Sequence, residues 1–199
     1  ALIWLFHISA IIGISIGYQE WFATKTWLNL IILNLGLFFV FSLYKPKNFL
    51  AYLIVTILGF SIEVLGVNYG WFFGEYAYGE NLGLKIAGTP LLIGLNWAML
   101  VIVTGQIARS FLPKKWMQVG FAAGLMLFLD ILMEETAPAF NFWEFKSEVV
   151  PISNFVAWFA FAVLFQLIVQ GLNSKGDSKI SYHIYIVQFL FFAYFFLWL

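Results

Sequence analysis

Residues 49–67, FLAYLIVTILGFSIEVLGV, form an apolar run in which Glu63 is the only charged residue. A helix that crosses the hydrocarbon core of a bilayer needs about 20 mostly apolar residues. A charged side chain at mid-bilayer is unfavourable by about 2.5–3.5 kcal/mol on insertion scales, so such a residue usually faces a protein interior and has a function. The stretch therefore predicts a membrane-spanning helix that carries one functional carboxyl group.

Similar apolar runs lie on both sides of this stretch. Long unbroken runs are typical of membrane helices, whereas a membrane barrel shows short alternating segments. We expect an all-α, polytopic bundle of about seven spans that forms a single transmembrane domain over residues 1–199, with the first run a span rather than a cleaved signal. The predicted spans are residues 2–18, 27–44, 49–67, 88–109, 116–133, 151–170 and 181–199.

The composition of the whole chain agrees with a protein embedded in a bilayer. Of its 199 residues, 63% are hydrophobic and 10% are charged, whereas about 25% of the residues of a soluble domain are charged. Acidic and basic residues number ten each, and no basic stripe suits nucleic acid. Cysteine is absent, which excludes disulfides and thiolate chemistry. We expect a multi-pass membrane protein that contacts the lipid bilayer and does not bind nucleic acid.

Charged residues divide unequally between alternate loops. The loops after the second, fourth and sixth predicted spans hold seven of the ten basic residues, and Asp177 is their only acid. Because cytoplasmic loops carry the excess of Lys and Arg, we expect these loops and the N-terminus inside and the C-terminus outside. The other loops hold three basic residues and seven acids, which are Glu20, Glu75, Glu80, Glu134, Glu135, Glu144 and Glu148.

This topology places polar residues of four spans at one level of the membrane. Glu63 lies about one turn before the outer end of its span. Asp130 lies near the outer end of the fifth span, with Glu134 one turn later on the same helix face. Asn96 and Asn154 follow the outer starts of the fourth and sixth spans. The spacing predicts a pocket in the outer third of the membrane.

A loop rich in glycine and aromatic residues lies over the same level. Between Gly70 and Gly83 it contains four glycines and five aromatic residues, among them Tyr76 and Tyr78. Glycine permits tight turns, and aromatic residues are common at the level of the lipid headgroups. We therefore expect a folded lid that can dip back into the protein, rather than a mobile connector.

Several of these residues also have structural interpretations. Asparagine often hydrogen-bonds between membrane helices, and tryptophans such as Trp97 and Trp158 are common at membrane interfaces. His7 and His183 lie near the inner ends of their predicted spans, where we expect structural roles. Two histidines are too few for the multi-histidine sites of membrane di-iron enzymes. The last span, 181–199, lacks the lysine that a retinal Schiff base needs.

The chain resembles the integral-membrane carotenoid hydratase family in the motif Glu63-x-x-Gly66-Val67-x-x-Gly70-x-x-Phe73-Gly74-x-Tyr76-x-Tyr78, followed by Gly88-x-Pro90-Leu91 and Trp97. The resemblance covers about residues 49–160 and continues at Leu129-Asp130, at Trp143 and at Val150-Pro151-x-x-Asn154-Phe155-x-x-Trp158. Members of this family are described as carotenoid biosynthesis proteins, and they include acyclic carotenoid 1,2-hydratases and bisanhydrobacterioruberin hydratase.

The resemblance implies a hydro-lyase of bacterial or archaeal membranes that adds water across the terminal C1=C2 double bond of a carotenoid ψ end group. It implies neither a redox cofactor nor an obligatory metal. Protonation at C2 leaves a tertiary cation at C1, which water captures. A buried carboxylic acid is a natural proton donor, a second carboxylate or an amide can hold the water, and aromatic faces stabilise cations.

These requirements give each polar residue a candidate role. We expect Asp130 to protonate the alkene and Glu63 to activate the water, or the reverse, with Glu134 as a further catalytic candidate. The candidate substrate-binding residues are Tyr76, Tyr78, Asn96, Trp97, Asn154 and Trp158.

Two alternatives stay open from the sequence. A carotenoid cyclase would use the same protonation, but an internal double bond would capture the cation and the site would exclude water. A non-enzymatic membrane subunit or lipid-binding scaffold would pair off its acids by hydrogen bonds and leave no cavity beside them.

Overall fold

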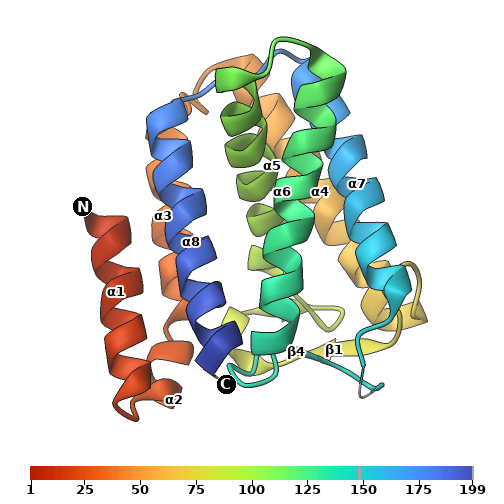
Figure 1. Cartoon of the computed structure of the whole chain (residues 1–199). Coiled ribbons are helices and arrows are strands. Elements are labelled where there is room, and N and C mark those ends of the chain that lie inside the picture. The colour runs from red at the N-terminus through yellow and green to blue at the C-terminus, as the bar shows by residue number, and fades with distance from the viewer. Residues whose placement is uncertain (148, 199) are drawn as a thin grey trace.

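The computed structural model of the chain describes residues 1–147 and 149–198, which form a bundle of helices with short strands at one end (Figure 1). Within these residues, six apolar segments are long enough to cross a membrane. The all-α polytopic bundle is thus confirmed, while the orientation of the N-terminus stays a prediction. The six segments are Gln19–Val40, which contains α2 (Gln19–Ala23) and α3 (Thr26–Val40), then α4 (Pro46–Tyr69), α5 (Leu91–Phe111), α6 (Lys115–Thr136), α7 (Ile152–Gly171) and α8 (Ser178–Trp198).

The first predicted span forms a shorter helix, α1 (Leu2–Ser15), of 14 residues. At 1.5 Å per residue it is about 21 Å long, less than the roughly 30 Å of a hydrocarbon core. The helix ends where Gly17 adopts a left-handed conformation, with φ of 98°. It packs along α8, where Ser15 Oγ lies 2.9 Å from the hydroxyl of Tyr194.

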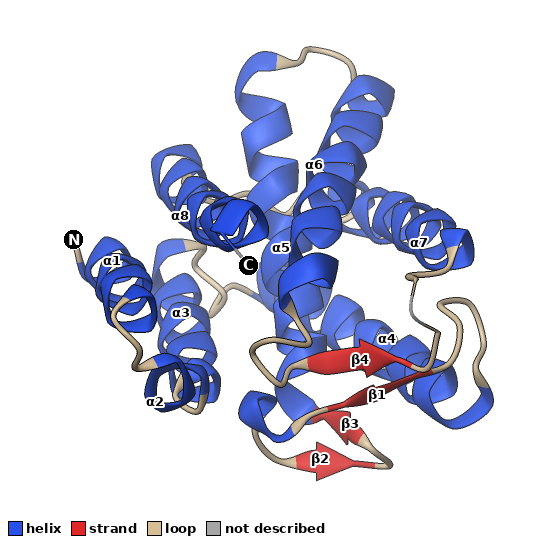
Figure 2. Ribbon diagram, turned by 60° about the horizontal axis from the view of Figure 1, so that its bottom comes forward, coloured by secondary structure: helices blue, strands red, loops and turns tan. Residues whose placement is uncertain are grey.

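Helix α5 is the centre of the bundle. In its most apolar window 72% of the residues are buried, against 28–44% in the other five segments. Seen from the strand end, α1, α3 and α8 lie on one side of α5 and α4 and α7 on the other (Figure 2). Gly94 allows α5 to pack closely against α4, because it has no side chain at the contact. A Cβ at this position would lie only 2.5 Å from the carbonyl oxygen of Thr56.

The strands close one end of the bundle. Strand β1 (Tyr76–Tyr78) pairs antiparallel with β4 (Trp143–Phe145), so that Tyr76 faces Phe145 and Tyr78 faces Trp143 in the register. Between them in the sequence lie the 3-10 helix η1 (Glu80–Leu82) and the paired strands β2 (Lys85–Ile86) and β3 (Thr89–Pro90). The glycine-rich loop is therefore folded, as expected. Its strand β1 pairs with β4 of a second loop, and the sequence did not predict this pairing.

Candidate active site

Glu63 lies at the centre of a set of hydrogen-bond donors. Its side chain is buried in α4, with 3% of its surface exposed. Tyr76 and Tyr78 donate from β1 to Glu63 Oε2, at 2.5 and 2.7 Å. Trp97 Nε1 donates from α5 to Glu63 Oε1, at 2.8 Å. The structure thus brings together four of the residues that the sequence singled out.

The strand geometry explains how two tyrosines reach one carboxyl group. Alternate residues of a strand point to the same face, so Tyr76 and Tyr78 both point from β1 toward α4. Gly66 lies one turn after Glu63, and a Cβ there would lie 2.7 Å from the hydroxyl of Tyr76. The missing side chain at Gly66 therefore leaves the space through which the Tyr76 phenol reaches Glu63.

The two phenols are held in their protonated form. Burial, and then the negative charge of Glu63, raise the pKa of Tyr76 and the pKa of Tyr78 above the usual value for tyrosine. Each hydroxyl consequently remains a donor to Glu63 throughout the neutral pH range.

A second pair of carboxyl groups lies on α6. Asp130 is fully buried and Glu134 is 5% exposed, and the two are one helical turn apart. Asn154, in the first turn of α7, donates through Nδ2 to Glu134 Oε1 at 2.9 Å and lies 3.4 Å from Asp130 Oδ2. Trp143 Nε1 donates to Glu134 Oε2 at 2.8 Å. Among the described residues, Asp130 Oδ1 has no hydrogen-bond partner.

These groups surround a small chamber of about 20 Å³. Seven of the predicted site residues line it: Glu63, Tyr76, Tyr78, Asn96, Glu134, Asn154 and Trp158. Trp97 and Asp130 are not part of its lining. Trp97 lies behind Glu63 and stacks on Trp158, with ring centroids 3.9 Å apart and planes at 18°. Asp130 is linked to the chamber by Asn154, whose Nδ2 lies 3.4 Å from Asp130 Oδ2.

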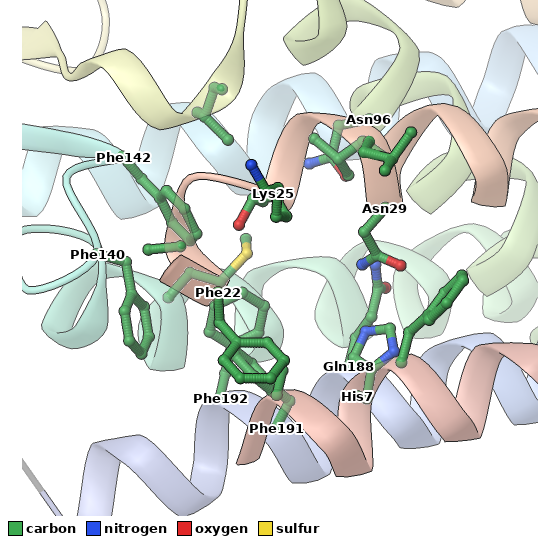
Figure 3. Close-up of a pocket in the computed structure, with 18 of the residues that line it drawn as sticks. His7, Phe22, Lys25, Asn29, Asn96, Phe140, Phe142, Gln188, Phe191 and Phe192 are labelled. Atoms are coloured by element: carbon green, nitrogen blue, oxygen red, sulfur yellow. The ribbon is translucent and has the colours of Figure 1, made fainter. Parts of the chain in front are cut away.

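A larger cavity of about 550 Å³ adjoins the chamber (Figure 3). Its lining is mostly apolar and comes from α1, α2, α3, η1, α5, α6, α8 and the segment that follows α6. Four residues line both spaces, namely Ile93, Asn96, Met133 and Trp143. No described residue hydrogen-bonds to the side chain of Asn96, so its amide is available at the junction. An apolar ligand in the larger cavity would reach, at this junction, the chamber that Glu63 and Glu134 line.

Some lining residues could not be singled out from the sequence. Ile93, Met133 and Phe145 have no polar group that marks them, and Phe73 stood out only as part of the family motif. For Ile93 and Met133 the available signal is their spacing. Ile93 lies one turn before Asn96, and Met133 lies one turn after Asp130. Helical spacing from a recognised polar residue would therefore have found two of them.

Other charged and polar residues have structural roles. Among the loop acids, Glu75 pairs with Lys146 and Glu80 pairs with Lys85, each at 2.8 Å, while Glu148 lies outside the described residues. His183 Nδ1 accepts a hydrogen bond from Trp4 Nε1. Within the described part of the chain, no group of three or more His, Asp or Glu residues has the arrangement of a metal site.

Comparison with known proteins identifies the family of the chain. Residues 21–199 match the family described as "Carotenoid biosynthesis protein". The chain belongs to this family. Over 132 residues it is 26% identical to bisanhydrobacterioruberin hydratase of Haloarcula japonica, an alignment that covers 60% of this chain and 43% of the relative. The chain thus spans less than half the length of this relative, and no solved structure matches it.

Proposed function

We propose that the chain is a carotenoid hydratase, a hydro-lyase that adds water across the terminal C1=C2 double bond of a ψ end group. The observation that carries this proposal is the chamber of about 20 Å³ lined by Glu63 and Glu134 at the end of an apolar cavity. A space of this size has room for about one water molecule. Membership of the carotenoid biosynthesis family and the similarity to a hydratase support the substrate class.

The apolar cavity suits the end of a polyene. Its volume of about 550 Å³ is that of a site for a small ligand. A carotenoid about as long as the roughly 30 Å hydrocarbon core is thick would extend beyond it into the bilayer. Its terminal double bond would lie at the junction between Ile93, Asn96, Met133 and Trp143, with the isopropylidene carbons directed at the chamber.

The proton for C2 comes from the pair Asp130 and Glu134. Two carboxyl groups that share one donor, Asn154 Nδ2, resist ionising together because their charges repel. The pair therefore holds one proton between its members. Glu134 lines the chamber and Asp130 does not. Glu134 is accordingly the donor that meets the alkene, and Asp130 shares and replaces its proton.

Glu63 serves as the base. Its two oxygens accept three hydrogen bonds, the pattern of an ionised carboxylate. After C2 is protonated, the water oxygen bonds to the C1 cation and its surplus proton passes to Glu63. A further water returns this proton to the Asp130–Glu134 pair, so the net change is one water added to the double bond. The face of Trp158, held by its stacking on Trp97, stabilises the cation.

The geometry favours hydration over the alternatives. A cyclase has to exclude water from its cation, whereas a water-sized chamber adjoins the reaction position here. A scaffold was expected to leave no cavity beside its acids, whereas Glu63 and Glu134 line a chamber that shares four lining residues with a cavity of about 550 Å³.

The test is expression of the chain in a lycopene-producing bacterium, with mass spectrometry of the extracted pigments. The wild-type protein should give products heavier by one or two waters. Glu63→Gln and Glu134→Gln should abolish them, and Asp130→Asn should reduce them. Glu135→Gln, which changes an exposed neighbour, is the matched control and should retain activity. Near-normal turnover by all three site variants, or a product of unchanged mass and altered retention time, would contradict the proposal.

A further inference from the structure

The large cavity contains a second set of polar side chains, away from the carboxyl groups. His7 on α1, Asn29 on α3 and Gln188 on α8 line it. In the view of Figure 3 they follow one another along one side of the cavity. We call these three residues the amide–imidazole cluster. They belong to the helices on the far side of α5 from α4 and α7 (Figure 2).

The cluster has hydrogen-bonding capacity that the described residues do not use. Gln188 is only 6% exposed, and within the described residues its Oε1 has no partner. Asn29 Oδ1 is likewise buried without a partner there. His7 Nδ1 donates to the carbonyl of Ile3 at 2.9 Å, and no described residue bonds to its Nε2. Polar groups buried in this way are unfavourable unless a ligand or water completes them.

The chemistry of the cluster defines the group that would complete it. The cluster contains no acid, so it does not call for a cation. Its amides offer both N–H donors and carbonyl acceptors, and its surroundings in the cavity are apolar. A neutral group that donates and accepts at once matches these side chains, and on a polyene that group is a hydroxyl.

We propose that the amide–imidazole cluster binds a hydroxyl group on the part of the polyene that enters the cavity. The protein would thereby select a hydroxylated carotenoid over the corresponding hydrocarbon. This inference rests on the proposed function for the polyene nature of the ligand. It concerns recognition alone and involves neither the Asp130–Glu134 pair nor Glu63.

The test measures which pigment the protein retains. Purified protein in detergent is incubated with equal amounts of lycopene and 1-hydroxylycopene, whose hydroxylated end can enter the cavity in place of a ψ end. The protein is then washed and extracted, and the ratio of bound pigments is measured. The wild-type protein should retain the hydroxylated pigment in about tenfold excess, the size expected for one or two net hydrogen bonds. Gln188→Met and Asn29→Leu, which keep the approximate size of each side chain but remove its amide, should bring the ratio close to one.

Gln170→Met is the matched control. Gln170 is 3% exposed, and both atoms of its amide lack partners among the described residues, yet it does not line this cavity. Its replacement should leave the ratio unchanged. A wild-type protein without preference, or a preference that survives in Gln188→Met and Asn29→Leu, would overturn the inference.

The pigment ratio is independent of turnover, so the two proposals fail separately. If the wild-type protein prefers the hydroxylated pigment and the cluster variants lose this preference, the role of the cluster is supported even if no pigment gains water. The absence of water addition would reject only the hydratase proposal. If the cluster variants instead slow the hydration of both pigments equally and the ratio of bound pigments does not change, the cluster conducts water and the inference is wrong.

Discussion

Replacing Gly66 with alanine tests whether Tyr76 positions Glu63. The added Cβ would lie 2.7 Å from the Tyr76 hydroxyl and 2.9 Å from Phe73 Cδ2, where an ordinary contact is at least 3.4 Å. The phenol therefore has to move by about 0.7 Å, the difference between 3.4 and 2.7 Å. This movement breaks or weakens its 2.5 Å hydrogen bond to Glu63. A hydrogen bond to a charged group contributes about 1.5–3 kcal/mol, which corresponds to a rate reduced about 10- to 150-fold.

The assay is the initial rate of water addition to the polyene in membranes that contain equal amounts of each variant. Gly124→Ala is the matched control, because a Cβ at this helical glycine meets no atom within 4 Å. It should keep the wild-type rate and gain up to about 1 kcal/mol of helix stability. Adding Gly66→Ala to Tyr76→Phe should cost less activity than adding it to the wild-type protein, because the closest clash, with the hydroxyl at 2.7 Å, is absent and the contact of 2.9 Å with Phe73 remains in both. Independent, additive losses in the double variant would refute this account of Gly66.

Two further predictions concern the junction and the phenols. Ile93→Phe should narrow the passage between the cavity and the chamber, and it should lower product formation while pigment is still retained. Ile102 is buried on the same helix but lines neither space, so Ile102→Phe should not have this effect. Equal rates of product formation in the two variants would contradict the role of Ile93 at the junction. The pKa of Tyr76 and the pKa of Tyr78 are raised above 10.0 in the folded protein. The folded state therefore keeps protons that the unfolded chain loses at higher pH. As a result, the free energy of unfolding should fall as the pH rises above 10.0. Thermal unfolding of Tyr76→Phe/Tyr78→Phe should show a smaller alkaline loss, and an unchanged loss would count against this explanation.

The level of the carboxyl groups in the bundle could be predicted because it depends on local sequence. Apolar run length locates the helices, and the positions of Glu63, Asp130 and Asn154 within their runs then determine how deep each lies. Helical periodicity also places Glu134 on the same face as Asp130. Each of these inferences uses residues that are close together in the chain.

The remaining features depend on contacts between distant segments. The pairing of Tyr76 with Phe145 joins two loops that are separated by two helices, and no local pattern specifies this register. Hence the sequence pointed to Tyr76 as a lid residue but did not show that it donates to Glu63. The position of Asp130 behind Asn154 likewise follows from the packing of α6 against α7. In the same way, the contribution of Gln188 to the large cavity depends on how α8 packs against α5.

One wall of the large cavity lies outside the stretch of the chain that matches the family, whereas the chamber lies within it. Helix α1 supplies lining residues such as His7 and Ile14, yet it precedes residues 21–199, the stretch that matches the family. The chamber residues all lie within that stretch. A substitution in α1 can therefore reshape the large cavity without altering any group to which we assign the proton or the water. If the proposed function holds, pigment choice and bond chemistry are in this respect separable, and an exchange of α1 between related chains is a direct route to changing one without the other.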